Sequence, residues 1–350
     1  MSGRKIRVLI VDDSAIVRRV LATVLEGAED IEVVGTAPDP YVARDKILAL
    51  HPDVMTLDIE MPRMDGLTFL DRIMQHRPMP VIIISSLAAG YTSTAMEALR
   101  RGAVEVLAKP GGPYSVGEMK AELAQKIRAA ASARLREPAP ARAVAQPAAP
   151  ARGGRHGLIA IGASTGGTVA IEQVLRALPA EMPPIVVVQH IPAGFSRAFA
   201  ERLNEVCALR VAEAANGRRL EPGLALVAPG NFHMEVDGPS GARAVRVFDG
   251  PKICYQRPAV DVLFHSLARS AAPETTALLL TGMGSDGAEG LLALRKAGAF
   301  TAAQDEASCV VFGMPREAIQ RNAACMVASL ADMPALLLRR AVSPHHQMAG

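Results

Sequence analysis

Short apolar runs recur along this chain, and most of them are followed by a segment with helical periodicity. Short runs rich in Val, Ile and Leu are typical of strands buried on both faces. Strands that alternate with helices through short loops predict parallel sheets with right-handed crossovers. In the first part of the chain the apolar runs are Ile6–Val11, Ile31–Thr36, Val54–Leu57, Val81–Ile84 and Val104–Ala108. The helical segments that follow them are Ala15–Leu25, Pro40–Ala49, Leu67–Gln75, Thr92–Arg101 and Val116–Ala131.

The same alternation resumes at Leu158 and continues almost to the C-terminus. Three later runs are short and alternating, which predicts antiparallel hairpins at one edge of a sheet; they are Leu224–Ala228, His233–Val236 and Ala244–Phe248. The expected fold class is α/β, with two doubly wound parallel-sheet domains. The first is flavodoxin-like, and the second is Rossmann-like with an antiparallel edge hairpin. Its other strands are expected at Leu158–Ile161, Ile185–Gln189, Thr276–Thr281 and Phe300–Gln304, and its helices at Thr168–Leu178, Ser196–Val206, Ala259–Ala271, Ala288–Ala297, Pro315–Arg321 and Met333–Arg340.

A stretch rich in Ala, Pro and Arg separates the two halves at residues 128–155. Its beginning continues the preceding helix, and from Glu137-Pro138 onward the composition predicts an extended, semi-rigid linker. The expected organisation is a first domain at 1–127, the linker at 128–155, a second domain at 156–342 and a flexible tail at 343–350.

Charge and composition exclude several classes of protein. A net charge of +3 over 350 residues, without interleaved aromatic residues, gives no basis for a nucleic-acid partner. No signal peptide is expected, and no apolar run approaches the roughly 20 residues of a membrane span. The four cysteines have no CxxC spacing, which is typical of reduced thiols that are buried in the core. We therefore expect a cytoplasmic protein without membrane insertion. We also expect it to be a monomer.

Polar side chains follow the strands of the first half, where the carboxyl ends of parallel strands form ligand sites. The carboxylates of Asp12, Asp13 and Asp58 would repel one another unless a cation lay between them, and oxygen ligands near phosphate favour Mg²⁺. Lys109 and Ser85 can bind an added anion. This set predicts a phosphoryl acceptor with a carboxylate nucleophile.

The first half resembles the receiver domain of response regulators. The matching motifs are Val11–Ser14, Asp58–Gly66, Ser85 and Lys109-Pro110. The resemblance implies that a histidine kinase phosphorylates Asp58, and that Ser85 and Lys109 detect the phosphoryl group. It also implies that Asp12, Asp13, Asp58 and the backbone carbonyl of Glu60 hold Mg²⁺. Many receivers carry an aromatic switch residue where this chain has Val106, so the usual aromatic switch is not expected.

The glycine-rich turn Gly162–Gly167 opens a helix after the first strand of the second half. Unpaired N–H groups at a helix N-terminus can hold a phosphate, or they can hold the oxyanion of an acyl-transfer intermediate. Dinucleotide binding would require an acidic residue after the next strand, but that strand ends at Gln189-His190. The alternative is that Ser164 is a nucleophile, since Gly162-x-Ser164-x-Gly166 fits the nucleophile-elbow pattern.

A serine nucleophile requires a base and an acid nearby. His190 and Asp286 also follow strands, so their side chains can converge with Ser164 at one edge of a parallel sheet. We expect His190 to act as base and then acid, and Asp286 to orient it. Thr165 and Met283 are the candidates for oxyanion or substrate contacts. The competitors are His233 and His265 for the base, and Asp261 and Asp305 for the acid.

The second half resembles the catalytic domain of the chemotaxis protein-glutamate methylesterase family. The matching motifs are Ile161–Gly167, Val188–Pro192, part of Ala228–His233, Arg257–Asp261 and Leu280–Gly287. The resemblance implies hydrolysis of glutamyl methyl esters on the cytoplasmic helices of chemoreceptors, and deamidation of receptor glutamines, without a cofactor for the ester chemistry. It assigns the same triad roles to Ser164, His190 and Asp286.

Two other functions stay open at this stage. A response regulator whose output domain only binds a partner would need a nucleic-acid motif or a broad basic face. A general esterase or amidase would act on small metabolites. If the family function holds, we expect the unphosphorylated receiver to restrict access to Ser164, and phosphorylation of Asp58 to relieve this restriction.

Overall fold

The computed structural model describes residues 4–86, 89–109, 116–135 and 157–342. Most of the expected linker and the expected C-terminal tail lie outside these residues. The chain divides into two compact units, residues 1–136 and 137–350. In the described residues no helix combines the length and the apolar character needed to cross a membrane.

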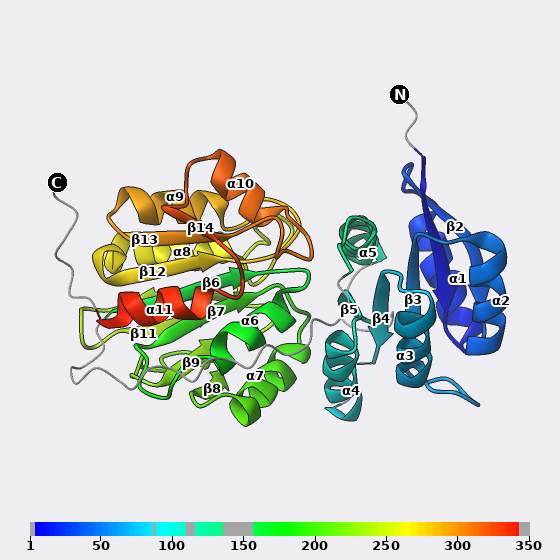
Figure 1. The fold of residues 1–350 in the computed structure, drawn as a ribbon, viewed down its shortest axis with the longest axis horizontal. Helices are drawn as coiled ribbons and strands as arrows, with labels where there is room; N and C mark the ends of the chain where they lie inside the picture. Colours follow the sequence, from blue (N-terminus) through cyan, green and yellow to red (C-terminus); the bar gives the residue numbers. More distant parts are fainter. Residues whose placement is uncertain (1–3, 87–88, 110–115, 136–156, 343–350) are drawn as a thin grey trace. The chain divides into compact units, whose positions relative to one another are not determined.

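The first unit is a five-stranded parallel sheet with strand order β2-β1-β3-β4-β5 (Figure 1). Its core consists of aliphatic strand residues that are almost completely buried. The strands are β1 (Ile6–Val11), β2 (Ile31–Ala37), β3 (Val54–Asp58), β4 (Val81–Ser85) and β5 (Glu105–Ala108). The helices are α1 (Ala15–Leu25), α2 (Pro40–Leu50), α3 (Gly66–His76), α4 (Ala89–Arg100) and α5 (Val116–Ala131). The expected flavodoxin-like sheet is confirmed.

The second unit is built on a seven-stranded parallel sheet with strand order β14-β13-β12-β6-β7-β9-β8. The central strand β6 lies between β12 and β7, so the loops that follow these three strands meet at one edge. The strands are β6 (Leu158–Ala163), β7 (Ile185–Gln189), β8 (Arg210–Glu213), β9 (Leu224–Val227), β12 (Thr275–Leu279), β13 (Phe300–Gln304) and β14 (Met326–Ala328). The helices are α6 (Gly167–Arg176), α7 (Phe195–Val206), α8 (Val260–Ser270), the short 3₁₀ helix Ala272–Glu274, α9 (Ala288–Lys296), α10 (Met314–Gln320) and α11 (Met333–Val342).

Three details of this sheet differ from the sequence-based expectation. β9 is not a hairpin strand, because it pairs in parallel with β7 and β8 inside the main sheet. The hairpin is formed by β10 (His233–Asp237) and β11 (Ala244–Phe248), which make a separate two-stranded sheet. β8 and β14 were not predicted from the sequence. They are only four and three residues long, and they lie at the two edges of the sheet with partly exposed side chains.

Helices α8 and α9 pack closely against each other beside the central strands. Val260, the first residue of α8, fills the space beside two glycines: an added Cβ at Gly162 or Gly287 would lie 2.3 or 2.6 Å from its side chain. Close packing of this kind fixes the start of α8 against the end of β6 and the start of α9. The N-termini of both helices therefore reach the edge of the sheet where the candidate site lies.

Candidate active site and phosphoacceptor site

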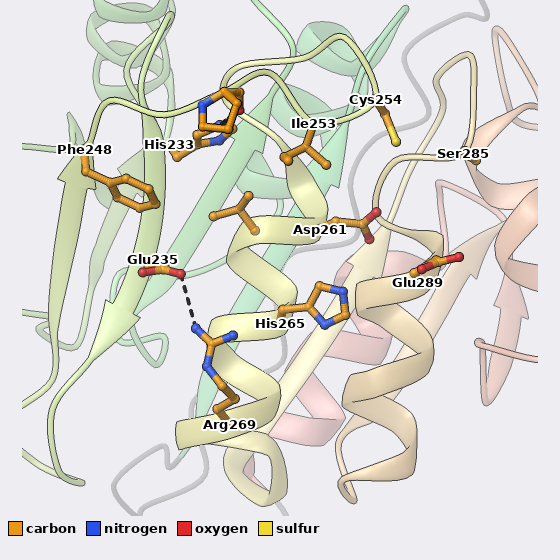
Figure 2. Close-up of a pocket in the computed structure, with 12 residues that line it drawn as sticks. His233, Glu235, Phe248, Ile253, Cys254, Asp261, His265, Arg269, Ser285 and Glu289 are labelled. Atoms are coloured by element: carbon orange, nitrogen blue, oxygen red, sulfur yellow. Dashed lines mark hydrogen bonds and ion pairs between the residues drawn. The ribbon is translucent and has the colours of Figure 1, made fainter.

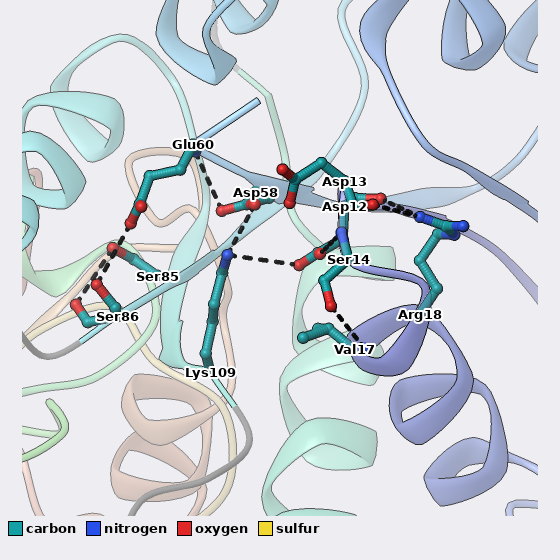
Figure 3. A network of polar contacts seen from close by, with 10 residues as sticks. All are labelled: Asp12, Asp13, Ser14, Val17, Arg18, Asp58, Glu60, Ser85, Ser86 and Lys109. Atoms are coloured by element: carbon teal, nitrogen blue, oxygen red, sulfur yellow. Dashed lines mark hydrogen bonds and ion pairs between the residues drawn. The ribbon is translucent and has the colours of Figure 1, made fainter. Parts of the chain in front are cut away.

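The acidic cluster of the first unit lies at the ends of β1 and β3 (Figure 3). One carboxylate oxygen from each of Asp12, Asp13 and Asp58 lies within 4.8 Å of the others. The Lys109 ammonium donates a hydrogen bond to Asp58 Oδ2 at 2.7 Å and lies 3.8 Å from Asp12 Oδ2. Asp58 Oδ1 accepts a hydrogen bond from the Glu60 backbone N–H at 3.1 Å. The predicted carboxylates and lysine are thus brought together.

Burial and like charge make this cluster electrostatically unfavourable. Burial raises the pKa of Asp12 to about 6, and the neighbouring charge of Asp58 adds to the increase. Burial also raises the pKa of Asp58, although the hydrogen bond from Lys109 opposes it. Asp12 Oδ2 is buried without a hydrogen-bond partner. A buried carboxylate oxygen without a donor, among oxygen ligands, fits a hard divalent cation such as Mg²⁺.

Ser85 ends β4 and is completely buried, and its hydroxyl makes a long hydrogen bond to the carbonyl of Ser86 at 3.4 Å. Ser86 in turn donates to the Glu60 carboxylate at 3.3 Å. Ser85 therefore contacts its own loop, and within the described residues no hydrogen bond joins it to Asp58. Val106, at the position of the usual aromatic switch, is 1% exposed within β5. It packs in the core of the sheet rather than at the surface.

The second site is centred on a buried histidine–aspartate pair. His190 Nε2 lies 2.7 Å from Asp286 Oδ2, and both side chains are 2% exposed. The same aspartate oxygen accepts a hydrogen bond from the Val260 backbone N–H at 2.6 Å, so it acts as an acceptor and Nε2 carries the proton. The other ring nitrogen, Nδ1, is buried without a hydrogen-bond partner. A neutral ring in this tautomer is a base at Nδ1.

The N-terminus of α8 holds Asp286 in its charged form. Asp286 Oδ1 accepts a hydrogen bond from the Asp261 N–H at 3.0 Å, in addition to the Val260 bond to Oδ2. Burial alone would raise the pKa of Asp286, but the bond to His190 and these two backbone bonds outweigh burial, and the net pKa lies below the ordinary value. The charged carboxylate is therefore available to stabilise a protonated imidazole.

Ser164 directly follows β6, and its neighbours hold its backbone in place. Its carbonyl accepts hydrogen bonds from the Gly167 N–H at 2.7 Å and from the Gln189 side-chain amide at 2.8 Å, while its N–H donates to Thr281 at 3.0 Å. His190 also donates its N–H to the Ala163 carbonyl, which keeps the two strand ends adjacent. Within the described residues the Ser164 hydroxyl makes no hydrogen bond. The hydrogen bond from this hydroxyl to His190 Nδ1 that the mechanism requires is therefore not formed in this structure.

Two glycines allow the close approach of backbone at this site. Gly166 has a φ of 77°, a left-handed conformation that favours glycine. An added Cβ at Gly282 would lie 2.6 Å from the Ser164 Cβ and 2.4 Å from the Met314 sulfur. The loop after β12 therefore lies directly against Ser164. In the described part of the chain the N–H of Met283, in this same loop, donates no hydrogen bond, so it can donate to a bound group.

The competing residues have other roles in the structure. His233 uses both ring nitrogens: Nε2 lies 2.9 Å from the Pro251 carbonyl, and Nδ1 accepts from the Ala259 N–H at 3.3 Å. Asp305 accepts from the Ser308 N–H in a local turn. His265 lies on α8 and lines a separate pocket. The sequence motifs did not predict that Gln189 and Thr281 bind the backbone of Ser164. Their positions at the ends of neighbouring strands could have indicated it.

Taken together, the two sites define a response regulator whose effector domain is an α/β enzyme with a serine–histidine–aspartate arrangement. A family model for the response regulator receiver domain matches residues 8–119, and the model for CheB methylesterase matches residues 159–337. The chain therefore belongs to the CheB methylesterase family, in the form that carries a receiver domain.

Individual relatives agree with this assignment. The protein-glutamate methylesterase/protein-glutamine glutaminase 4 of Anaeromyxobacter dehalogenans (strain 2CP-C) is 55% identical over 323 residues, covering 91% of this chain and 90% of that protein. The protein-glutamate methylesterase/protein-glutamine glutaminase of Escherichia coli (strain K12) is 48% identical over 341 residues, covering 96% and 97%. The crystal structure of the Thermotoga maritima CheB methylesterase catalytic domain matches 53% of this chain and 98% of its own, with 37% identity and a TM-score of 0.51.

Proposed function

We propose that this protein is a phosphorylation-activated hydrolase that removes methyl esters from glutamate side chains of chemoreceptors and deamidates receptor glutamines, for chemotactic adaptation. The observation that carries the proposal is the buried His190–Asp286 pair, 2.7 Å apart, beside Ser164. The names of the relatives support the substrate class, and the receiver domain supports the control by phosphorylation.

In the first chemical step the Ser164 hydroxyl attacks the ester carbonyl and gives its proton to His190 Nδ1. The ring is then an imidazolium, and Asp286 stabilises it through the hydrogen bond from Nε2. The negative charge on the carbonyl oxygen is stabilised by the Met283 N–H and by Thr165 at the start of the turn. Collapse of the tetrahedral intermediate breaks the C–O bond to methanol, which leaves with the proton from Nδ1.

In the second step a water molecule hydrolyses the acyl-enzyme. His190 Nδ1 takes a proton from the water, the resulting hydroxide attacks the carbonyl carbon, and the bond to Ser164 breaks. The serine oxygen recovers the proton, and a free glutamate side chain leaves. With glutamine as substrate the same steps release ammonia in place of methanol. No cofactor is required for either reaction.

The receiver would accept a phosphoryl group on Asp58 from the phosphohistidine of a kinase. An Asp58 oxygen forms the new bond to phosphorus as the bond to the histidine nitrogen breaks, and Lys109 and Ser85 bind the transferred group. Asp12, Asp13, Asp58 and the Glu60 carbonyl are the ligands we assign to Mg²⁺, which supplies neutralisation of the phosphoryl charge. The free Asp12 oxygen supports this assignment.

We further propose that the unphosphorylated receiver, residues 1–127, limits access to the catalytic domain, residues 156–342, through the linker 128–155. Deletion of residues 1–150 should then raise the basal esterase activity above that of the unphosphorylated full chain. Activity at or below that level would argue against inhibition by the receiver. We place the protein in the cytoplasm as a monomer, with the chemotaxis kinase and the receptor helices as its partners.

The direct test of the triad is Ser164→Ala, which should abolish methanol release from methylated receptor. Retained release would contradict the nucleophile assignment. A general esterase is distinguished by its substrates, because it would hydrolyse small methyl esters as well as it hydrolyses methylated receptor.

A further inference from the structure

Two helix N-termini meet behind Asp286, and each lacks a capping side chain of its own. The N-cap residue of α8 is Ala259 and that of α9 is Gly287, and neither makes a side-chain capping bond. The first N–H groups of a helix have no partner within the helix and require an acceptor. Because the starts of both helices are buried, these acceptors have to come from the protein itself.

The two helices supply acceptors for each other. Asp286, which lies just before α9, accepts the N–H groups of Val260 and Asp261 in the first turn of α8. Asp261 Oδ1, within that turn, accepts the N–H of Gly290 in the first turn of α9 at 2.7 Å. The two aspartates therefore cap the two helices reciprocally. Gly290 allows this approach, since an added Cβ there would lie 2.6 Å from Phe264 and 3.0 Å from Asp261 Oδ1.

We infer that Asp261 is a positioning residue of the esterase site: by capping α9 it holds the loop that carries Asp286 in the place where Asp286 binds His190. The inference rests on the proposed function and deepens it. Among the described residues no hydrogen bond joins Asp261 to Ser164 or to His190. It acts on the reaction only through Asp286.

The surroundings of Asp261 fit a neutral capping group beside a charged aspartate. Carboxylate oxygens of Asp261 and Asp286 lie within 4.8 Å of each other, which disfavours two negative charges. Burial raises the pKa of Asp261 to about 7, and the charge of Asp286 adds to the increase. Asp261 lines a pocket of about 570 Å³, and the other titratable groups that line it are His233, Glu235, Cys254, His265, Arg269 and Glu289 (Figure 2). An Asn side chain matches a protonated Asp in size and keeps an acceptor oxygen for Gly290.

The test compares Asp261→Ala with Asp261→Asn in the full chain, activated with acetyl phosphate. Loss of a helix cap costs up to about 2 kcal/mol, so Asp261→Ala should lower kcat about 30-fold with little change in KM. Asp261→Asn should keep kcat within about threefold, because the cap on Gly290 is retained. Glu289→Gln is the matched control: it removes an exposed carboxylate from the same turn of α9 without removing a cap, and its kcat should stay within about twofold.

A second readout does not depend on turnover. In the wild type the Nε2 proton of His190, hydrogen-bonded to Asp286, should give a downfield NMR signal that Asp261→Asn retains and Asp261→Ala loses. The inference is overturned if Asp261→Ala keeps both kcat and this signal, or if Asp261→Asn loses as much kcat as Asp261→Ala. If Asp261→Ala does not fold, Asp261→Asn decides: kcat within about threefold of the wild type with the signal retained supports the inference, and a loss of kcat of about 30-fold or of the signal overturns it. Absence of methanol release by the folded wild type would instead refute the proposed function, and the NMR signal would still test the positioning role.

Discussion

Replacing Asp286 by Asn tests the electrostatic part of the mechanism, since the side chain keeps its shape and loses its charge. Asp286 Oδ2 accepts from His190 Nε2 at 2.7 Å and from Val260 at 2.6 Å, and Oδ1 accepts from Asp261 at 3.0 Å. All three partners are donors, so the amide NH₂ of Asn faces a donor in either orientation. If it faces His190, the ring must carry its proton on Nδ1, and Nδ1 can no longer accept the proton of Ser164.

The magnitude follows from the bonds that are lost. A hydrogen bond to a charged group contributes about 1.5–3 kcal/mol, and Asp286→Asn weakens at least the one to His190 and one backbone bond. A combined loss of about 4–5 kcal/mol in the transition state corresponds to a decrease in kcat of about 10³-fold to 10⁴-fold. Because Asp286 is 2% exposed and lies behind the imidazole, KM for the receptor should change little.

Methanol release from methylated receptor membranes, at saturating substrate and with acetyl phosphate, measures this kcat. Asp305→Asn is the matched control, because Asp305 also follows a strand of the sheet but only binds Ser308 in a local turn. Its kcat should stay within about twofold of the wild type. An Asp286→Asn protein that is folded and keeps kcat within tenfold of the wild type would refute the role of Asp286 as the charge that stabilises imidazolium.

Four further predictions concern packing, ion pairing and titration. Gly282→Ala should lower the kcat of methanol release at least about tenfold, because the added Cβ would lie 2.6 Å from that of Ser164. A wild-type kcat would show that the loop after β12 moves to accommodate the methyl group. Lys126→Met should destabilise the receiver by about 3 kcal/mol in urea unfolding, since it removes the ammonium that lies 2.7 Å from the buried carboxylate of Glu105. The double variant with Glu105→Leu should recover most of that loss. Burial raises the pKa of Cys207 to about 11. In a variant that keeps only this cysteine, the rate of alkylation should therefore rise about tenfold per pH unit from pH 7 to 10. A rate that reaches a plateau near pH 9 would contradict this. Burial and the charge of Asp286 raise the pKa of Asp261 from 3.8 to about 7 in the native state, so the native protein binds one proton more than the unfolded chain between these two pH values. Its stability should therefore fall as the pH rises from about 4 to 7, relative to that of Asp261→Asn, and should change little more above pH 7.

Most of the fold could be predicted because its strands are apolar runs that the chain marks clearly. β8 and β14 could not, since they are short edge strands whose pairing, rather than their composition, makes them strands. The assignment of the run at 224–228 to an antiparallel hairpin was wrong for a related reason. The residues of a short strand do not indicate which strand it pairs with. Only the structure shows that β9 lies between β7 and β8.

The candidate sites show the same limit at the level of side chains. Strand-end positions led to Ser164, His190 and Asp286 as candidates, because parallel topology brings such positions together. They could not give the orientation of the histidine ring, in which Nε2 binds Asp286 and Nδ1 is left free. An acid in the first turn of α8 is favoured by the helix dipole alone, so the bond from Gly290 to Asp261 could not be foreseen from local sequence.

The central claim is that Ser164 hydrolyses receptor glutamyl methyl esters under the control of Asp58. Methanol release from methylated receptor membranes, with and without acetyl phosphate, tests it most directly when the wild type is compared with Ser164→Ala and Asp58→Asn. The wild type should release methanol faster with the phosphodonor, Asp58→Asn should release it at a rate the phosphodonor does not change, and Ser164→Ala should release none. Release by Ser164→Ala at the wild-type rate, or a phosphodonor effect that persists in Asp58→Asn, would contradict the account.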